Sequence, residues 1–250
     1  MVKKILLFLT IIVCIGITGC EKGASDEDYK LLQNAEWEHY NSVTGEMEII
    51  SFSKKKEFSY HCVCGEPVGD SDVYDKYSYT KEGNIIIKSL SDKKTIDVLH
   101  IDEICLLIKM DGKVIEFFNS DKVKSRWEHG SLYYCDKCTE YIKGCSGYDS
   151  VVEISMDEIV LAPEDYGTDG KEYADFLRTV QLAEDVEFYK LDVDMVKDEN
   201  DVFKSHDCTY EEISKESLAD MNTKSGMEAF IWYNDNAQIS KVVFYEETVK

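Results

Sequence analysis

The sequence predicts a mostly β protein of the α+β class, in which an antiparallel barrel or meander of about eight strands precedes a small α+β domain. Between residues 36 and 119, short segments of alternating apolar and polar residues are separated by turn residues. Asp111-Gly112 stands between two apolar segments and is the strongest hairpin signal in the chain. After residue 126 the pattern is mixed, with apolar β-prone segments and two stretches that favour helix.

The strands expected in the first domain, residues 35–120, follow one another with short connections. They are residues 36–40, 47–52, 57–64, 73–79, 85–89, 95–101, 104–110 and 113–118. Closing this up-and-down arrangement into a barrel would remove its exposed edges. At about ten residues per strand and turn the barrel is small, so we expect side chains to fill it, and a hollow barrel is the alternative.

The layout of residues 35–119 resembles that of bacterial lipocalin-like domains, which are often lipid-anchored. The first strand of that family carries Gly-x-Trp, and Ala35-Glu36-Trp37 keeps the tryptophan but lacks the glycine. The resemblance implies a barrel mouth that could hold a small apolar ligand.

The second domain is expected over residues 126–250, after a polar boundary at 120–126. Its expected strands are residues 127–134, 149–154, 158–161, 186–196, 227–233 and 237–245. Apolar residues at helical spacing predict a helix over 171–182. Thr209, with Glu212 three residues later, predicts the capped start of a short helix.

The first twenty residues have the features of an export signal. Lys3 and Lys4 precede an apolar run over residues 5–17, which is shorter than the roughly 20 residues of a membrane-spanning helix. The run ends in Ile17-Thr18-Gly19-Cys20, which resembles the lipobox of bacterial lipoproteins. That family more often has Leu in place of Ile17 and Ala or Ser in place of Thr18. An ordinary signal peptide cut elsewhere, or an uncleaved membrane helix, is the alternative.

The lipobox resemblance implies an address and an anchor. Residues 1–19 would be removed as a signal peptide, and Cys20 would carry diacylglycerol through a thioether. Residues 20–34 would then comprise the lipidated cysteine and a polar tether, at the extracytoplasmic face of the cell membrane. Only two arginines stand among 28 basic residues, a bias that indicates a low-GC Gram-positive bacterium.

The charge of the chain excludes one class of partner. Removal of residues 1–19, which include two lysines and no acidic residue, leaves a formal net charge of −24. Such acidity repels nucleic acid and anionic lipid. We therefore expect no nucleic-acid partner, and we expect the membrane to be bound through the lipid on Cys20.

Seven cysteines follow Cys20, and outside the cytoplasm disulfides are the default expectation. The possible disulfide partners are Cys62, Cys64, Cys105, Cys135, Cys138, Cys145 and Cys208. An odd number leaves at least one thiol unpaired. Cys62 and Cys64 share one face of their expected strand with Phe58 and Tyr60, so we expect both to point into the barrel. Pairing of either with Cys105 on another strand is easier than a bond between the two.

Cys135-Asp-Lys-Cys138, with Cys145, looks most like a site. Two cysteines at this spacing can share one metal ion, and the remaining ligands of a structural zinc could come from Cys145, Cys208, His129 or His206. The usual second pair of ligands is missing. A redox C-x-x-C normally begins a helix, whereas Gly144 and Gly147 favour a loop. Disulfides or idle thiols are the first interpretation, and zinc and redox chemistry are the alternatives.

No constellation of catalytic residues is recognisable, since the histidines share no catalytic spacing and no nucleophile-elbow or phosphate-loop motif occurs. We therefore expect a non-catalytic binding or interaction module with no cofactor, whose partner is a small apolar ligand or a protein. A second hypothesis is an envelope redox or zinc-stabilised protein that uses Cys135, Cys138 and Cys145. A third is a structural or assembly lipoprotein with no small ligand. Cys135 and Cys138 side by side and exposed at a helix start would favour the second.

Overall fold

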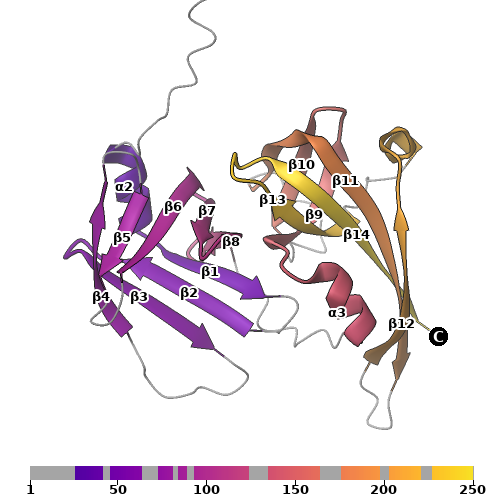
Figure 1. Ribbon diagram of the computed structural model, residues 1–250, viewed down its shortest axis with the longest axis horizontal. Helices are drawn as coiled ribbons and strands as arrows, with labels where there is room; N and C mark the ends of the chain where they lie inside the picture. Colours follow the sequence, from indigo (N-terminus) through magenta and orange to yellow (C-terminus); the bar gives the residue numbers. More distant parts are fainter. Residues whose placement is uncertain are drawn as a thin grey trace, which may run out of the picture.

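A computed structural model describes residues 26–41, 46–63, 73–80, 84–88, 93–123, 135–163, 176–197, 203–220 and 227–249. Two units built mainly of strands lie side by side (Figure 1). The lipobox, Cys64, His129 and the strand expected at 127–134 lie outside the described residues.

The first unit is a closed antiparallel barrel. Its strands are β1 (Glu36–Asn41), β2 (Glu46–Phe52), β3 (Glu57–Val63), β4 (Val73–Tyr79), β5 (Asn84–Lys88), β6 (Lys93–Ile101), β7 (Cys105–Met110) and β8 (Lys113–Asn119). Each strand pairs with the next, and β1 pairs with β8 through Trp37 and Asn119. The barrel prediction is confirmed, with strand ends within two residues of those expected. Asp111 and Gly112 form the β7–β8 turn, both at positive φ.

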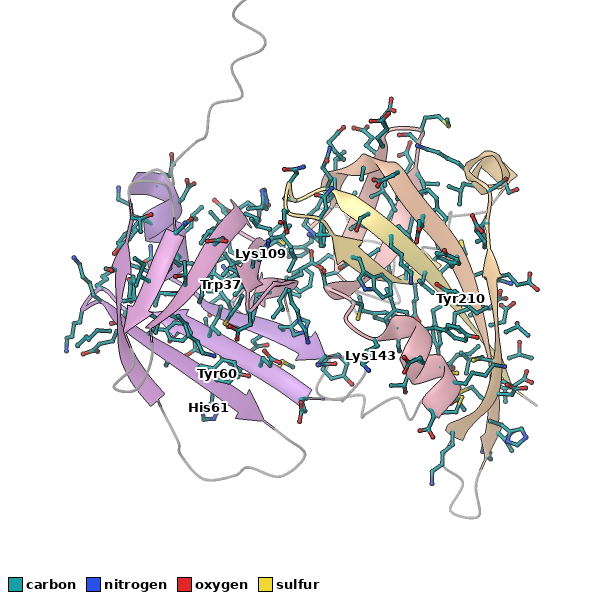
Figure 2. All side chains as sticks on the ribbon, in the orientation of Figure 1. Trp37, Tyr60, His61, Lys109, Lys143 and Tyr210 are labelled. Carbon is teal, nitrogen blue, oxygen red and sulfur yellow. The ribbon has the colours of Figure 1, made fainter. Side chains whose placement is uncertain are left out.

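Large side chains occupy the interior of the barrel. Trp37, Phe52 and Phe117 are fully buried there with isoleucines and leucines from most of the other strands. Figure 2 places Trp37 among these strands. The expectation of a filled barrel is therefore supported by the described residues.

An unexpected helix, α2 (Asp26–Gln33), packs on the barrel. It lies in the segment interpreted from the sequence as a polar tether. That interpretation followed the many polar residues of the segment and overlooked Leu31 and Leu32. Leu32 is fully buried in the barrel core, and its carbonyl accepts a hydrogen bond from Trp37 Nε1 at 3.3 Å. The Gln33 side chain donates to the Tyr77 hydroxyl at 2.8 Å. Residues 26–33 therefore belong to the folded unit.

Strand β7 is buried on both faces. Leu106 and Ile108 point into the barrel, whereas Cys105 and Leu107 pack with residues of the second unit. A strand covered on both sides needs a continuous apolar run, as this one has, because alternation would leave polar groups inside.

The second unit is a six-stranded sheet with one helix and one 3₁₀ turn. Its elements are α3 (Asp136–Ile142), β9 (Gly147–Ile154), β10 (Glu158–Pro163), β11 (Arg178–Lys197), β12 (Phe203–Glu212), η3 (Lys215–Asp220), β13 (Met227–Tyr233) and β14 (Ile239–Val249). The strand order is β10-β9-β13-β14-β11-β12, and β11 pairs with β14 in parallel. The first residues of β11 also pair with β10, so the sheet curls strongly.

Two expected helices of this unit are wrong. The helix expected at 171–182 is strand from Arg178 onward, because those residues pair with β10. The helix expected to begin at Thr209 lies inside β12, where Thr209 is opposite Asp192. In both places long-range strand pairing overrides a local helical pattern.

The sheet has a core on each face. Phe188, Ile231 and Phe244 pack with Leu107 and Val114 of the barrel on one side. Leu191, Val193 and Val243 pack beneath α3 on the other side. The barrel and α3 therefore cover different faces of the sheet.

A buried ionic cluster joins the two units. Arg178 at the start of β11 donates to Glu116 of the barrel at 2.5 Å and to Asp149 of β9 at 3.0 Å. The Tyr233 hydroxyl donates to the same Glu116 oxygen at 2.9 Å. Cys105 Sγ lies 3.1 Å from Arg178 Nη1. Glu116 and Asp149 are at most 1% exposed, so water has almost no access to the two carboxyl groups.

The two carboxyl groups of this cluster lie in surroundings that favour the protonated form of Asp149. Burial, together with the nearby charge of Glu116, raises the pKa of Asp149 well above its usual range. Glu116 Oε2 and Asp149 Oδ1 have no donor among the described residues. A proton on Asp149 would leave one negative charge to balance Arg178.

Candidate thiol site

Helix α3 places Cys135 and Cys138 together. Cys135 is the residue before the first turn, with extended backbone angles of φ −69° and ψ 160°, and its carbonyl accepts from Thr139 N at 3.0 Å. Cys138 lies inside that turn and is fully buried. The expectation of a loop is therefore wrong. Gly144, at φ +76°, follows the helix, and Gly147 opens β9, so both glycines lie beyond the helix.

Three sulfur atoms meet between α3 and β12. Cys135 Sγ and Cys138 Sγ are 3.1 Å apart, and the Sγ atoms of Cys135, Cys138 and Cys208 all lie within 4.8 Å of one another. A disulfide bond is about 2.05 Å long. Two thiolates on one tetrahedral zinc ion would be about 3.8 Å apart, given Zn–S bonds of about 2.3 Å. The observed distance between the two sulfurs thus lies between the disulfide and the zinc-bound values. The sulfurs would have to approach by about 1 Å to form a disulfide.

The three thiols differ in exposure and acidity. Cys135 is half-buried, whereas Cys138 and Cys208 are at most 2% exposed. Burial acts to raise the pKa of Cys135, but hydrogen bonds with Cys138, Ser205 and the Lys137 backbone outweigh it and lower this pKa. Burial raises the pKa of Cys138 and of Cys208. Cys135 is therefore the group most readily present as a nucleophilic thiolate.

Polar contacts hold the helix and strand in register around the sulfurs. Lys137 Nζ donates to Asp207 Oδ1 at 2.8 Å and to the Cys208 carbonyl at 2.6 Å. The Cys135 backbone NH donates to the Ser205 hydroxyl. The rings of Tyr141 on α3 and Tyr210 on β12 stack at 4.2 Å with an angle of 4° between their planes. Figure 2 shows Tyr210 beside this helix.

The other cysteines and histidines named from the sequence lie elsewhere. Cys145 is half-buried beyond the end of α3 and is not part of the three-sulfur group. Cys105 lies in the ionic cluster, so its expected pairing with Cys62 or Cys64 has no support there. His206 is exposed on β12 and does not join the group. The side chain of Cys62 lies outside the described residues. Of the residues that the sequence offered as further ligands of a metal site, Cys208 lies beside Cys135 and Cys138.

A cavity of about 700 Å³ lies between the two units rather than inside the barrel. The end of β6 and the β6–β7 turn contribute His100 and Asp102, and the start of β11 contributes Thr179 and Gln181. His100 Nε2 and Asp102 Oδ2 are 3.0 Å apart at its edge. A binding role for the barrel therefore stays a prediction.

No helix within the described residues has both the length and the apolar character needed to cross a membrane. Comparison of the chain with models of protein families, with curated proteins and with solved structures found no significant match.

Proposed function

We propose that this protein is a membrane-anchored extracytoplasmic protein whose Cys135 and Cys138 carry out thiol–disulfide exchange. The observation that carries the proposal is the placement of the two sulfurs 3.1 Å apart at the start of α3, one half-buried and the other fully buried. Exchange needs an accessible attacking thiolate and a second thiol close enough to displace the product. The C-x-x-C pair supplies both.

The reaction balances with a disulfide of a protein or a small thiol as the co-reactant. The Cys135 thiolate attacks one sulfur of that disulfide, whose other sulfur leaves as a thiolate. Cys138 then loses its proton and attacks Cys135 Sγ, which breaks the mixed disulfide and releases the second thiolate. Two electrons pass from the cysteine pair to the co-reactant, and the reverse sequence oxidises a dithiol.

Equilibration of the full-length chain in detergent micelles with glutathione buffers tests this function. Acid quenching, alkylation and mass spectrometry would report the fraction of Cys135–Cys138 disulfide at each ratio of reduced to oxidised glutathione. We expect a reversible two-electron transition that Cys138→Ser abolishes, and we expect that variant to accumulate a mixed disulfide on Cys135. Cys145→Ser is the matched control and is expected to leave the transition unchanged.

Two results would contradict the exchange function. One is an alkylation pattern at Cys135 and Cys138 that does not change across the glutathione series. The other is one equivalent of zinc in the purified protein, with thiols that react only after a chelator is added, which would favour the structural-metal alternative.

We further propose that lipid on Cys20 anchors the protein to the outer face of the membrane. The support is the lipobox-like end of the apolar segment. Two acyl chains, at about 0.8 kcal/mol per buried CH₂, bind far more firmly than one. Because α2 begins at Asp26, the chain between it and Cys20 spans at most about 20 Å, and the barrel would lie close to the lipid.

Metabolic labelling with an alkyne fatty acid tests the anchor. We expect labelling of the wild type and none of Cys20→Ala. Cys14→Ala, which changes a cysteine inside the apolar run, is the matched control and is expected to keep the label. Equal labelling of the wild type and Cys20→Ala would rule out this attachment site.

A further inference from the structure

Cys138 lies between two possible disulfide partners. Its sulfur is 3.1 Å from Cys135 Sγ, and the sulfur of Cys208 belongs to the same group, whose members all lie within 4.8 Å of one another. A sulfur atom forms one disulfide at a time, so the two bonds are mutually exclusive. Cys138 can therefore take part in two oxidised forms of the site, which differ in which of the other two thiols remains reduced.

We propose that Cys208 is a third working thiol of the site and displaces Cys135 from Cys138 after oxidation. This inference rests on the proposed exchange function and adds a residue to it. Cys208 loses its proton and its thiolate attacks Cys138 Sγ. The Cys135–Cys138 bond breaks as the Cys138–Cys208 bond forms, and Cys135 leaves as a thiolate. No net electron transfer occurs, so the step needs no oxidant or reductant.

The surroundings of the three sulfurs favour this direction. The most acidic thiol is the best leaving group in an exchange reaction, and Cys135 is the thiol whose pKa is lowered. Burial raises the pKa of Cys208, and the ammonium group of Lys137, which donates to the Cys208 carbonyl, acts in the opposite direction. The product disulfide is buried and links α3 to β12, two elements that Lys137 and the Tyr141–Tyr210 stack already hold together.

The exchange has a chemical consequence for the protein. With Cys138 bound to Cys135, no thiol of the trio is accessible, because Cys208 is 2% exposed. With Cys138 bound to Cys208, the half-buried Cys135 is again a nucleophile. The two-electron-oxidised protein would thus keep a thiolate able to attack a disulfide in a substrate, as disulfide rearrangement requires.

Peptide mapping can separate the two disulfides. Lys137 lies between Cys135 and Cys138, so trypsin places Cys135, Cys138 and Cys208 in three different peptides. The full-length protein in detergent micelles would be oxidised with oxidised glutathione, quenched with acid, alkylated, digested and analysed by mass spectrometry. We expect both cross-linked peptide pairs in the wild type, together with alkylated Cys135.

Three variants complete the test. Cys208→Ser and Cys208→Ala are both expected to give only the Cys135–Cys138 pair and a several-fold loss of Cys135 alkylation in the oxidised protein. Cys135→Ser is expected to form the Cys138–Cys208 pair. Cys145→Ser, from the same unit but outside the trio, is the control and is expected to match the wild type.

The outcomes separate this inference from the function beneath it. If the wild type forms only Cys135–Cys138 and Cys135→Ser forms no Cys138–Cys208 bond, the role of Cys208 is refuted while the exchange function stands. If Cys138 enters no disulfide under any condition, both are refuted.

Discussion

At the scale of single residues, Glu116 and Gly147 show how closely the two units approach. Glu116 projects from the barrel into the second unit, where its backbone NH donates to the Ser146 carbonyl at 2.9 Å. A Cβ atom at position 147 would overlap Glu116 Oε2 and lie 3.1 Å from its Cδ. Glu116 is 1% exposed, so its carboxylate has no free space to enter. Glycine at 147 is thus required by a neighbour rather than by backbone torsion.

Gly147→Ala is expected to destabilise the protein by about 3 kcal/mol, because it displaces a buried, paired carboxylate. Gly144→Ala is the control. Gly144 has positive φ but no atom near its missing side chain, so only a backbone cost of about 1 kcal/mol is expected. Urea unfolding followed by tryptophan fluorescence measures both, and an equal loss in the two variants would contradict the close approach.

Asp149 predicts a pH dependence of stability. Its pKa is raised in the folded protein by burial beside Glu116, with Arg178, Tyr233 and Cys105 as the other facing groups. The folded state therefore holds this proton more tightly than the unfolded chain. The contribution is complete below the usual Asp pKa of 3.8 and is lost as the pH rises through the higher folded pKa.

Asp149→Asn keeps the donor at every pH, so the fall in stability with rising pH is expected to be smaller in this variant than in the wild type. Urea midpoints measured at a series of pH values test this. Asp157→Asn, at an exposed position, is the control and is expected to follow the wild type. Parallel curves for the wild type and Asp149→Asn would show that Asp149 is ionised in the folded protein.

The sequence revealed part of the site at this scale. The spacing of Cys135 and Cys138 predicted that the two could cooperate, because three residues is a local distance. Cys208 is 70 residues away from Cys138 and stood only as one of several candidates to complete a metal site. Arg178 carried no signal in the sequence, because its hydrogen-bond partners come from four other strands.

At the scale of elements, α2 shows that a short polar helix can be part of a core. Leu32→Ala is expected to cost about 3 kcal/mol, since Leu32 is fully buried against the barrel. Lys30→Ala, on the exposed side of the same helix, is expected to change stability by less than about 0.5 kcal/mol. Chemical unfolding of both variants measures the difference, and similar small effects would mean that the helix does not stabilise the barrel.

The eight strands of the barrel were predictable because each one pairs with its sequence neighbour across a short connection. The second unit was harder, since β11 pairs with β10, β12 and β14. Helix α3 has seven residues, too few for a stable helix in isolation, so its formation depends on packing of Cys138 and Ile142 under it. No local sequence pattern indicates such packing between distant residues.

At the scale of the whole molecule, the ionic cluster adds buried charge pairs to the apolar core that the two units share. Arg178→Met would leave Glu116 and Asp149 buried together without a positive charge. We expect a loss of about 3–5 kcal/mol. The combined change Arg178→Met, Glu116→Gln and Asp149→Asn is expected to lose less, because it removes the carboxylates as well. Lys143→Met, at an exposed position, is the control.

Differential scanning calorimetry tests this connection. The wild type is expected to unfold in one transition, because Cys105, Leu107 and Val114 of the barrel share a core with the sheet. Arg178→Met is expected to unfold at a lower temperature than the wild type. A single unshifted transition in that variant would show that the cluster does not couple the units.

The position of β14 within the sheet affects the order in which the two units can fold. β14 follows every other strand in sequence, yet it lies between β13 and β11. During synthesis the barrel strands are complete once Asn119 has emerged, whereas the second unit waits for residues 239–249. Cys135 and Cys138 emerge well before Cys208 does. A disulfide that forms early in folding would therefore join these two neighbours, and the arrival of β12 would make the bond to Cys208 possible.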